Sequence, residues 1–419
     1  MKENVQKFDV VVLGGGPAGL AAAISAHDEG ARVLLIEREN RLGGILKQCI
    51  HDGFGLIYFK ERLTGPEYAG RFIEDFFKRD IEYYTNAFLI EARRSAQSGY
   101  ELLLQSARGM IFVNAKTIIL ACGCRERTSR QVFIHGERPA GIFTAGTAQY
   151  LVNIMGKMPV KRCVILGSGD IGLIMARRFT LEGAEVEGVY EIKDSPAGLA
   201  RNISQCLDDF DIPLHLSSTV TRVFGSKRVE AVEVCKVDKN FNSIESTKRT
   251  VLCDALILSV GLLPENEIAE SLSIDIDPAT KGPVVDQTLM TNLPGVFCCG
   301  NALHVNDLVD YVSQSGTSAG IAAAGFALSE RELVPVTYDK NDFLYALPQY
   351  YDKTKGGDLT LYFRSRDDVK KRKVEVFADG KLLKGKKYSR IVPGEMEVLN
   401  FDPEKEDFTG ITVVMSPYG

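Results

Sequence analysis

The 419-residue sequence lacks the signatures of several protein classes. It has no C-x-x-C motif, and its nine cysteines and five histidines show no zinc or iron–sulfur spacing, so we expect no metal site. No apolar run reaches the roughly 18 residues of a membrane span. The formal net charge of −5 argues against nucleic acid or an anionic membrane as the main partner, although it leaves room for local basic patches. The cysteines suggest no disulfide framework, and a reducing cytoplasm is the simplest setting.

What the sequence does contain is a glycine-rich loop between short apolar segments, in residues 8–39. The loop holds Gly14, Gly16 and Gly19 as G-x-G-x-x-G, between a predicted strand and a predicted helix. Such glycines permit a tight turn, close approach of backbone N–H groups to a pyrophosphate, and packing of the helix on the sheet. A second predicted strand ends at Glu37, where a carboxylate can bind ribose hydroxyls. Together these parts predict a dinucleotide site.

The same pattern recurs at residues 160–191 and ends at Glu191. Its glycines are Gly167, Gly169 and Gly172. Two fingerprints predict two dinucleotides, and the alternative is a decayed repeat that serves only as scaffold. A 2′-phosphate needs a cation near the end of the second strand, but Lys193 is flanked by two acids and no arginine is near. The sequence therefore favours NAD(H) over NADP(H).

Three further segments carry a resemblance to a known family: TIILACG (117–123), CDALILSVGLLPEN (253–266) and LPGVFCCGN (293–301). With the two fingerprints, they resemble the two-dinucleotide-binding pyridine nucleotide-disulfide oxidoreductase superfamily over residues 8 to about 330. The resemblance implies FAD at the first fingerprint and NAD(H) at the second. Cys122 stands where the family usually has threonine, and Asn301 where it has aspartate, so flavin binding is expected with altered detail.

A narrower resemblance rests on CIHDGFG (49–55), ACGCRER (121–127), PAGIFTAGTAQYL (139–151) and GNALHVNDLVDYV (300–312). These segments are similar to the NADH-oxidising flavoprotein subunits of glycerol-3-phosphate, proline, opine and hydrogen cyanide synthase-type dehydrogenases. The resemblance implies a partner dehydrogenase or electron-carrier subunit. It leaves room for a homo-oligomer.

The expected fold is α/β, with two Rossmann-like three-layer domains in a thioredoxin-reductase-like arrangement and a small C-terminal all-β domain. We expect an FAD-binding domain in residues 1–130 and 264–335, an NAD(H)-binding domain in 131–263, and the β domain in 336–419, which could dock a partner. In the tail, Asp379-Gly380 between β-rich runs predicts a hairpin, and the cluster RDDVKKRK (366–373) is interpreted as a solvated loop.

The motifs and the resemblance give two sets of candidate cofactor residues. The residues expected to contact FAD are Gly14, Gly16, Pro17, Ala18, Glu37, Arg38, Gly43, Gly44, Ala87, Cys122, Gly123, Gly300, Asn301 and Val309. The residues expected to contact NAD(H) are Gly167, Gly169, Asp170, Ile171, Glu191 and Gly261. The helix expected after Asn301 should point its N-terminus at the flavin and stabilise the reduced, anionic form.

The dithiol of the family's disulfide reductases is missing from both of its usual positions. Alignment with the thioredoxin-reductase type places Ala145 and Ala148 at the cysteine positions, and the glutathione-reductase type would place cysteines near Leu46 and His51. We therefore expect electrons to leave for a partner that this chain does not contain.

Two polar residues beside the double glycine are the candidates for catalysis, Gln48 and His51. A histidine polarised by Asp52 could donate a proton beside the reduced flavin, and a structural or solvent-facing role is the alternative. Cys49 could be a redox thiol, but packing is the simpler role, as it is for Cys122, Cys124, Cys298 and Cys299.

The function that we expect is hydride exchange between FAD and NAD(H), with electrons passing to or from a partner dehydrogenase subunit. One alternative is an autonomous FAD/NAD(P)H oxidase or small-substrate reductase. Another is a structural subunit that binds both nucleotides without turnover.

Overall fold

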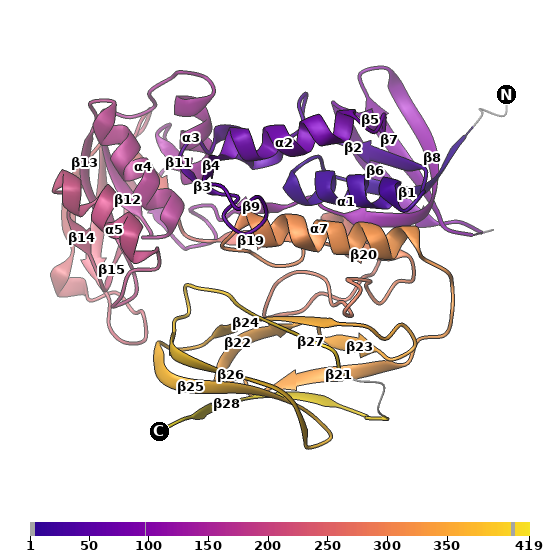
Figure 1. Ribbon diagram of the computed structural model, residues 1–419. Helices are drawn as coiled ribbons and strands as arrows, with labels where there is room; N and C mark the ends of the chain where they lie inside the picture. Colours follow the sequence, from indigo (N-terminus) through magenta and orange to yellow (C-terminus); the bar gives the residue numbers. More distant parts are fainter. Residues whose placement is uncertain (1–4, 97, 404–406) are drawn as a thin grey trace. The chain divides into compact units, whose positions relative to one another are not determined.

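The computed structural model describes residues 5–96, 98–403 and 407–419 (Figure 1). The chain forms two compact units. Unit 1 combines the described residues up to Cys124 with those from Pro264 onward, and unit 2 is Arg125–Leu263. The chain leaves unit 1 in β9 (Cys124–Glu126) and returns in β19 (Leu262–Pro264), so unit 2 is an insertion in unit 1.

Unit 1 is built on a parallel sheet in the order β5-β2-β1-β8-β20. Its strands are β1 (Gln6–Leu13), β2 (Val33–Ile36), β5 (Glu82–Tyr84), β8 (Gly109–Leu120) and β20 (Val296–Cys298). The valines of β1 are buried on both faces, as a central parallel strand requires. The first half of β8 continues as an antiparallel meander with β7 (Tyr100–Ser106) and β6 (Ala87–Arg94).

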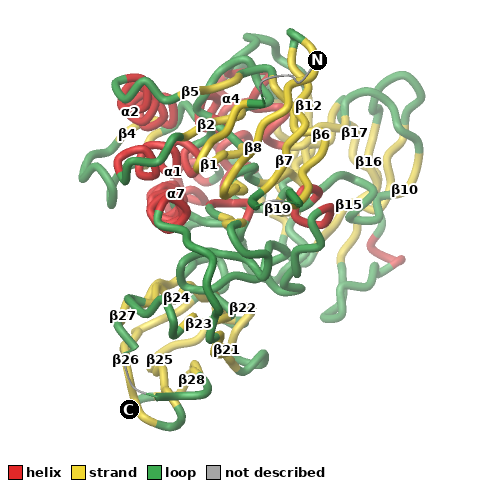
Figure 2. The backbone as a smooth tube through the Cα atoms, turned by 90° about the vertical axis from the view of Figure 1, so that its right-hand side faces the viewer, coloured by secondary structure: helices red, strands yellow, loops and turns green. Residues whose placement is uncertain are grey.

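Three helices pack on this sheet: α1 (Pro17–Asp28), α2 (Gly65–Phe77) and α7 (Val309–Ala324). Helices α1 and α7 lie side by side in both views (Figures 1 and 2). A Cβ on Gly316 would stand 2.2 Å from the carbonyl oxygen of Ala18, and one on Gly320 would stand 2.3 Å from that of Ala22. Glycine therefore sets the separation of the two helices. The shorter elements of this part are η1 (Gly44–Gln48), β3 (Asp52–Phe54), β4 (Leu63–Thr64), α6 (Glu267–Ser271) and η4 (Gly300–Ala302).

Unit 2 repeats the parallel arrangement in the order β11-β18-β12-β13-β14. These strands are β11 (Ile142–Thr144), β12 (Arg162–Leu166), β13 (Glu185–Tyr190), β14 (Leu214–His215) and β18 (Ala255–Leu258). Its helices are α3 (Ala145–Asn153), α4 (Asp170–Leu181) and α5 (Ala200–Cys206), with short helices η2 (Asp208–Phe210) and η3 (Glu245–Thr247). A second sheet has the order β10-β15-β16-β17. It contains β10 (His135–Gly136), β15 (Ser218–Phe224), β16 (Ala231–Lys236) and β17 (Arg249–Leu252).

The C-terminal part of unit 1 consists of two sheets, with the orders β23-β21-β28-β25-β26 and β22-β24-β27. Their strands are β21 (Leu333–Tyr338), β22 (Phe343–Leu347), β23 (Tyr350–Asp352), β24 (Leu359–Ser365), β25 (Val369–Ala378), β26 (Lys381–Ile391), β27 (Glu397–Phe401) and β28 (Ile411–Pro417). Side chains of both sheets form one core, which includes Phe343, Phe363 and Val376. The predicted α/β fold with a C-terminal β region is confirmed.

The interpretation of RDDVKKRK (366–373) as a loop between strands is wrong for its second part: residues 366–368 lie between β24 and β25, but residues 369–373 belong to β25. Four of its five cations, at positions 370–373, lie inside β25, which pairs with both β26 and β28. The strand forms because Val374, Val376 and Ala378 are buried in the core, and this burial outweighs the preference of a charge run for solvent. The predicted Asp379-Gly380 turn does join β25 to β26, with both residues at positive φ.

The β domain packs on the rest of unit 1 through its three-stranded sheet. Tyr345, Leu347 and Tyr362 belong to the same hydrophobic core as β1 and α7. Polar contacts join the same two parts: Arg364 pairs with Asp307, and the side-chain amide of Gln287 donates to the main-chain oxygen of Asp352. Among the described helices, none is both long and apolar enough to cross a membrane.

Candidate dinucleotide sites

The first glycine loop has a shape that only glycine permits. Gly14 has a φ of +110°, and a Cβ there would stand 2.4 Å from the carbonyl oxygen of Ala121. A Cβ on Gly19 would stand 1.8 Å from the carbonyl oxygen of Gly14, so α1 begins in direct contact with the loop. Gly16 precedes the helix and Pro17 is its first residue; no side chain caps this end and its first turn holds no acid. The first amides of α1 are therefore free of side-chain acceptors and suit a pyrophosphate.

Glu37 holds the loop from the end of β2. Its buried carboxylate accepts hydrogen bonds from the backbone N–H groups of Gly15 and Glu39, each at 2.7 Å. Each carboxylate oxygen keeps a further acceptor position, so ribose hydroxyls could still bind it. Ala87, at the start of β6, donates its N–H to the carbonyl oxygen of Glu37, and Arg38 lies 3.7 Å from the carboxylate of Glu265.

The double glycine packs directly on the first fingerprint. Gly43 donates its N–H to the carbonyl oxygen of Gly15 at 2.8 Å. Gly44 has a φ of +56°, and a Cβ there would stand 2.9 Å from the Cα of Gly16. The two loops therefore approach backbone to backbone.

Two segments that are distant in the sequence also lie against the first glycine loop, and we call the loop, the double glycine and these segments the first cluster. Cys122 donates its thiol to the carbonyl oxygen of Leu13, at 3.6 Å, and burial raises its pKa to about 12. A Cβ on Gly300 would stand 2.7 Å from that of Ala18, so η4 reaches the start of α1. The side-chain oxygen of Asn301 accepts a hydrogen bond from the N–H of Asn306. The structure thus brings together FAD candidates that lie far apart in the sequence.

A helix follows Asn301 as predicted: α7 begins at Val309, one of the expected FAD contacts, and its second residue is a buried acid for which we predicted no role. Asp310 is 1% exposed and accepts hydrogen bonds from the N–H groups of Gly55, Ile57 and Tyr58, at 3.3, 3.1 and 2.7 Å. It therefore fixes the loop after β3 to the helix end. An acid among apolar residues in a first helical turn was the available signal, but its partners lie some 250 residues away and no local pattern names them.

The two catalytic candidates, Gln48 and His51, lie shortly after the double glycine. Gln48 is buried, at the end of η1. His51 lies against Phe54, and its Nδ1 is 3.3 Å from the main-chain oxygen of Asp52. The carboxylate of Asp52 instead bonds Arg62 at 3.0 Å, so the expected polarisation of His51 by this carboxylate is absent. Catalysis by Gln48 or His51 stays a prediction.

All nine cysteines are free thiols, and seven of them are buried. Burial raises the pKa of Cys49 to about 12, which keeps it a neutral thiol at physiological pH. Among the residues that the structure describes, no group of His, Cys, Asp and Glu side chains could hold a metal ion.

In unit 2 the second glycine loop has the same construction. Gly167 has a φ of +95°, and a Cβ there would stand 2.0 Å from the carbonyl oxygen of Ser259. Glu191 is buried and accepts hydrogen bonds from the N–H and hydroxyl of Ser168 and from the N–H of Lys193, at 2.9, 2.6 and 3.0 Å. Both fingerprints therefore use the acid in the same way, to pin the loop between the first two glycines.

The remaining NAD candidates lie around this loop. Gly169 precedes α4, and Ile171 packs against the core of unit 2. Asp170 accepts hydrogen bonds from Leu199 and Asn202, so it organises the chain after β13 and adds a negative charge at the start of α4. Gly261 has a φ of +98° and accepts a hydrogen bond from Arg127, and a Cβ there would meet no described atom within 4 Å.

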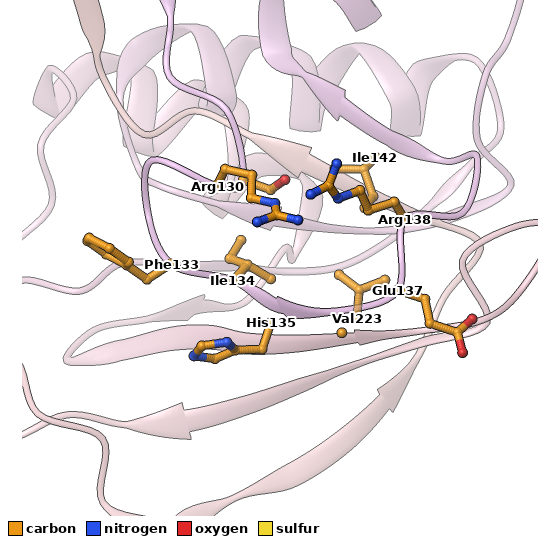
Figure 3. Close-up of a pocket in the computed structure, with 10 residues that line it drawn as sticks. Arg130, Phe133, Ile134, His135, Glu137, Arg138, Ile142 and Val223 are labelled. Carbon is orange, nitrogen blue, oxygen red and sulfur yellow. The ribbon is translucent and has the colours of Figure 1, made fainter.

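A surface cavity in unit 2 lies apart from these residues. It is lined by the segment from Ser129 to Arg138, with Ile142 and Val223, and includes none of the predicted cofactor residues. Figure 3 shows the guanidinium groups of Arg130 and Arg138 turned toward each other, while the side chain of Glu137 points away. Sequence reasoning gave this cavity no role.

Residues 8–325 match the family of pyridine nucleotide-disulphide oxidoreductases. The chain belongs to this family. Its members bind FAD and use NAD(P), which confirms the predicted superfamily, cofactors and oxidoreductase class.

Two curated relatives and one solved structure illustrate the range of the family. An opine oxidase subunit of Agrobacterium tumefaciens is 23% identical over 348 residues, which are 78% of this chain and 66% of the relative, just under two thirds of its length. A ferredoxin–NADP reductase of Leuconostoc citreum is 22% identical over 314 residues, or 73% of this chain and 87% of the relative. The thioredoxin reductase of T. acidophilum has a TM-score of 0.61 at 20% identity, covering 76% of this chain and 98% of that one. This structural likeness confirms the expected thioredoxin-reductase-like fold.

The residues of the first cluster fit FAD. The amides of α1 are uncapped, Glu37 is a buried acid at the end of β2, and at Gly16 a Cβ would meet only the Cα of Gly44, at 3.8 Å. These features leave both the charge and the space that a pyrophosphate and a ribose require.

Proposed function

We propose that this chain is an FAD-dependent oxidoreductase of the cytoplasm that exchanges hydride with NAD(H) and passes electrons to or from a separate partner. The partner would be a dehydrogenase subunit or an electron carrier. Bound FAD supplies the redox chemistry, because it can take up a hydride and release the electrons again.

The observation that carries the proposal is what occupies the dithiol positions. Ala145 and Ala148 are fully buried in α3, and Leu46 is buried in the core of unit 1. His51 takes the remaining position, and the adjacent Cys49 stays protonated. None of these side chains can pass electrons through disulfide exchange, so the reaction needs an electron acceptor other than the residues at the dithiol positions.

The chain's own residues would bind and orient the cofactors. The amides of α1 and Glu37 would hold the pyrophosphate and ribose of FAD, and the N-terminus of α7 would favour negative charge on the flavin. In unit 2, Glu191 and the start of α4 would hold the nicotinamide dinucleotide. NAD(H) is favoured over NADP(H), because Glu191 offers a carboxylate to a 2′-hydroxyl and would repel a 2′-phosphate.

The names of the relatives support a separate partner. One is a subunit of an opine oxidase, and another is a reductase of ferredoxin. The first name indicates an oxidase of more than one subunit, and the second indicates a reaction with ferredoxin, a separate protein.

The test is an anaerobic titration of the isolated chain followed by turnover assays. NADH should bleach the flavin absorbance, while thioredoxin-like and glutathione-like disulfides stay oxidised. An artificial dye should then restore turnover. Flavin that stays oxidised with both NADH and NADPH would contradict the proposal and favour a structural nucleotide-binding subunit. Steady turnover with oxygen or a small substrate, without an added acceptor, would favour an autonomous enzyme.

A further inference from the structure

Strands β25 and β26 with their turn, residues 369–391, form a hairpin of unusual charge, which we call the basic hairpin. It carries nine cations and two acids, a net charge of +7, whereas the whole chain carries −5 and the rest of it therefore −12. The cations are Lys370, Lys371, Arg372, Lys373, Lys381, Lys384, Lys386, Lys387 and Arg390. Such a concentration of one sign in an acidic chain marks a surface for an anionic partner.

The pairing of the strands brings like charges together. In the ladder between β25 and β26, Lys370 stands opposite Arg390, and Lys373 stands opposite Lys387. Like charges directly opposite each other destabilise a sheet. Asp368 and Glu375 offset part of this repulsion, because they bond Arg390 at 2.5 Å and Lys373 at 2.6 Å.

Several cations of the hairpin have no ion-pair partner among the described residues. Lys370, Lys371, Lys384 and Lys387 are exposed and form no ion pair with the residues that the structure describes. Electrostatic repulsion between these lysines therefore remains in the folded sheet, where it does not contribute to stability.

Within unit 1 the basic hairpin lies on the outer sheet. The three-stranded sheet of the β domain makes the contact with the core of unit 1, whereas the hairpin belongs to the five-stranded sheet (Figure 1). Strand β26 is the edge of this sheet, next to β25 alone among the described strands. Exposed apolar side chains accompany the cations, with Leu382 49% and Val414 38% exposed.

We propose that the basic hairpin binds the surface of an anionic lipid bilayer. Seven of its nine cations are lysines, which protein interfaces exclude from their centres, whereas clusters of lysine near a membrane bind anionic headgroups through charge alone. The two aromatic rings of the hairpin offer little surface on which bases could stack, because Tyr388 is buried and Phe377 is half-buried, and this disfavours single-stranded nucleic acid.

Protection of the sheet edge explains only part of the pattern. Lysine on an edge strand hinders pairing with other chains, which accounts for the lysines of β26. Lys373 lies in the stretch of β25 that pairs with β26 on one side and with β28 on the other, and the carbonyl oxygen of Lys371 accepts a hydrogen bond from the N–H of Tyr418. An anionic surface accounts for both strands, and it concerns the β domain rather than the redox site.

The test is cosedimentation of the intact, FAD-loaded chain with lipid vesicles. We expect binding to vesicles of equal parts phosphatidylglycerol and phosphatidylcholine, and none to phosphatidylcholine alone. Binding should weaken with salt, because the Debye length falls from about 10 Å at 0.1 M to about 3 Å at 1 M. Equal binding to both vesicle types, or no binding to either, overturns the proposal.

A charge-reversal variant with a matched control locates the surface. Lys370→Glu, Lys371→Glu, Lys384→Glu and Lys387→Glu together should weaken binding to the anionic vesicles at least about 100-fold. The control replaces Lys157, Lys227, Lys239 and Lys355, equally exposed lysines outside the hairpin, and it changes the net charge by the same amount. Reduction of the flavin by NADH should be unchanged in both variants, which shows that they are folded.

Two results would contradict the proposed surface. Equal loss of binding in the control variant would show that only the net charge matters. Binding of the wild-type chain to poly-glutamate but not to the anionic vesicles would point to an acidic polypeptide as the partner.

Discussion

At the scale of single residues, a substitution of Gly44 tests whether FAD binding requires contact between the first glycine loop and the double glycine. A Cβ at this position would lie 2.9 Å from the Cα of Gly16, and the residue has a positive φ. We expect Gly44→Ala to weaken FAD binding at least about tenfold, because the loops must separate and overpacking costs about 1–3 kcal/mol. The measurement is the dissociation constant of FAD, from its fluorescence on titration of the apoprotein.

The control for this variant is Gly30→Ala. Gly30 also has a positive φ, but a Cβ there would meet nothing within 4 Å. It should lose about 1 kcal/mol of stability from backbone strain and keep its FAD affinity. Equal loss of affinity in the two variants would show that backbone strain, rather than the contact with Gly16, is responsible.

His304 makes stability depend on pH. Burial against Tyr345 and Tyr362, with the nearby charge of Arg364, lowers its pKa to about 3, and its Nδ1 has no hydrogen-bond partner among the described residues. Because the unfolded state binds this proton below pH 6.5 and the folded state does not, stability falls as the pH falls from 6.5 toward 3. At pH 5 the loss from this residue is about 2 kcal/mol.

The variant His304→Phe removes this contribution. We measure the free energy of unfolding in urea at pH 7 and at pH 5. Its decrease between the two pH values should be about 2 kcal/mol smaller in the variant than in the wild-type chain. An unchanged difference would mean that His304 is protonated in the folded protein.

At the scale of elements, the contact between α1 and α7 depends on Gly320. A Cβ there would lie 2.1 Å from the hydroxyl oxygen of Ser25 and 2.3 Å from the carbonyl oxygen of Ala22. Gly320→Ala should push the helices apart and lower the free energy of unfolding by about 1–3 kcal/mol. Gly325→Ala, at the end of the same helix with 3.6 Å of clearance, should change it by less than about 1 kcal/mol, and urea unfolding measures both. A larger loss in Gly325→Ala would contradict this account of the packing.

Most elements around the glycine loops could be predicted because their signals are local. Strand β2 ends at Ile36, next to the predicted Glu37, and a helix follows Asn301 as predicted, beginning at Val309. The wrong prediction for residues 369–373 has a different origin. Whether Lys370 to Lys373 form a strand depends on burial of Val374 and Val376 by chain segments far away, and that burial leaves no local trace in a run of charges.

The candidate sites likewise contain residues that local motifs predict and residues that only the folded structure shows. The glycines and terminal acids follow from motifs, and the structure gathers them as expected. The role of Asp310 could not be predicted, because it is set by three amides from a loop that the helix meets only in the folded chain.

At the scale of the whole molecule, the two units should divide the cofactors between them. Glu191→Gln leaves one of the donors on Ser168 and Lys193 unpaired, because an amide has a single acceptor oxygen. We expect the KM for NADH to rise about tenfold or more, while the FAD content stays that of the wild-type chain. Glu185→Gln, at the exposed start of β13, the strand that ends just before Glu191, should change neither quantity. Loss of FAD from the Glu191 variant would contradict the assignment of one cofactor to each unit.

The insertion of unit 2 also has a consequence for biosynthesis. Unit 2 is continuous from Arg125 to Leu263, so all of its strands have left the ribosome before β20 is made. The parallel sheet of unit 1, in contrast, needs β20 beside β8, a pairing of residues separated by more than 170 positions. Loops that long make such pairing slow and late. The nascent chain therefore carries the whole of unit 2 before η4 and α7 are made, so the first glycine loop is completed, and flavin uptake becomes possible, only after unit 2 has been synthesised.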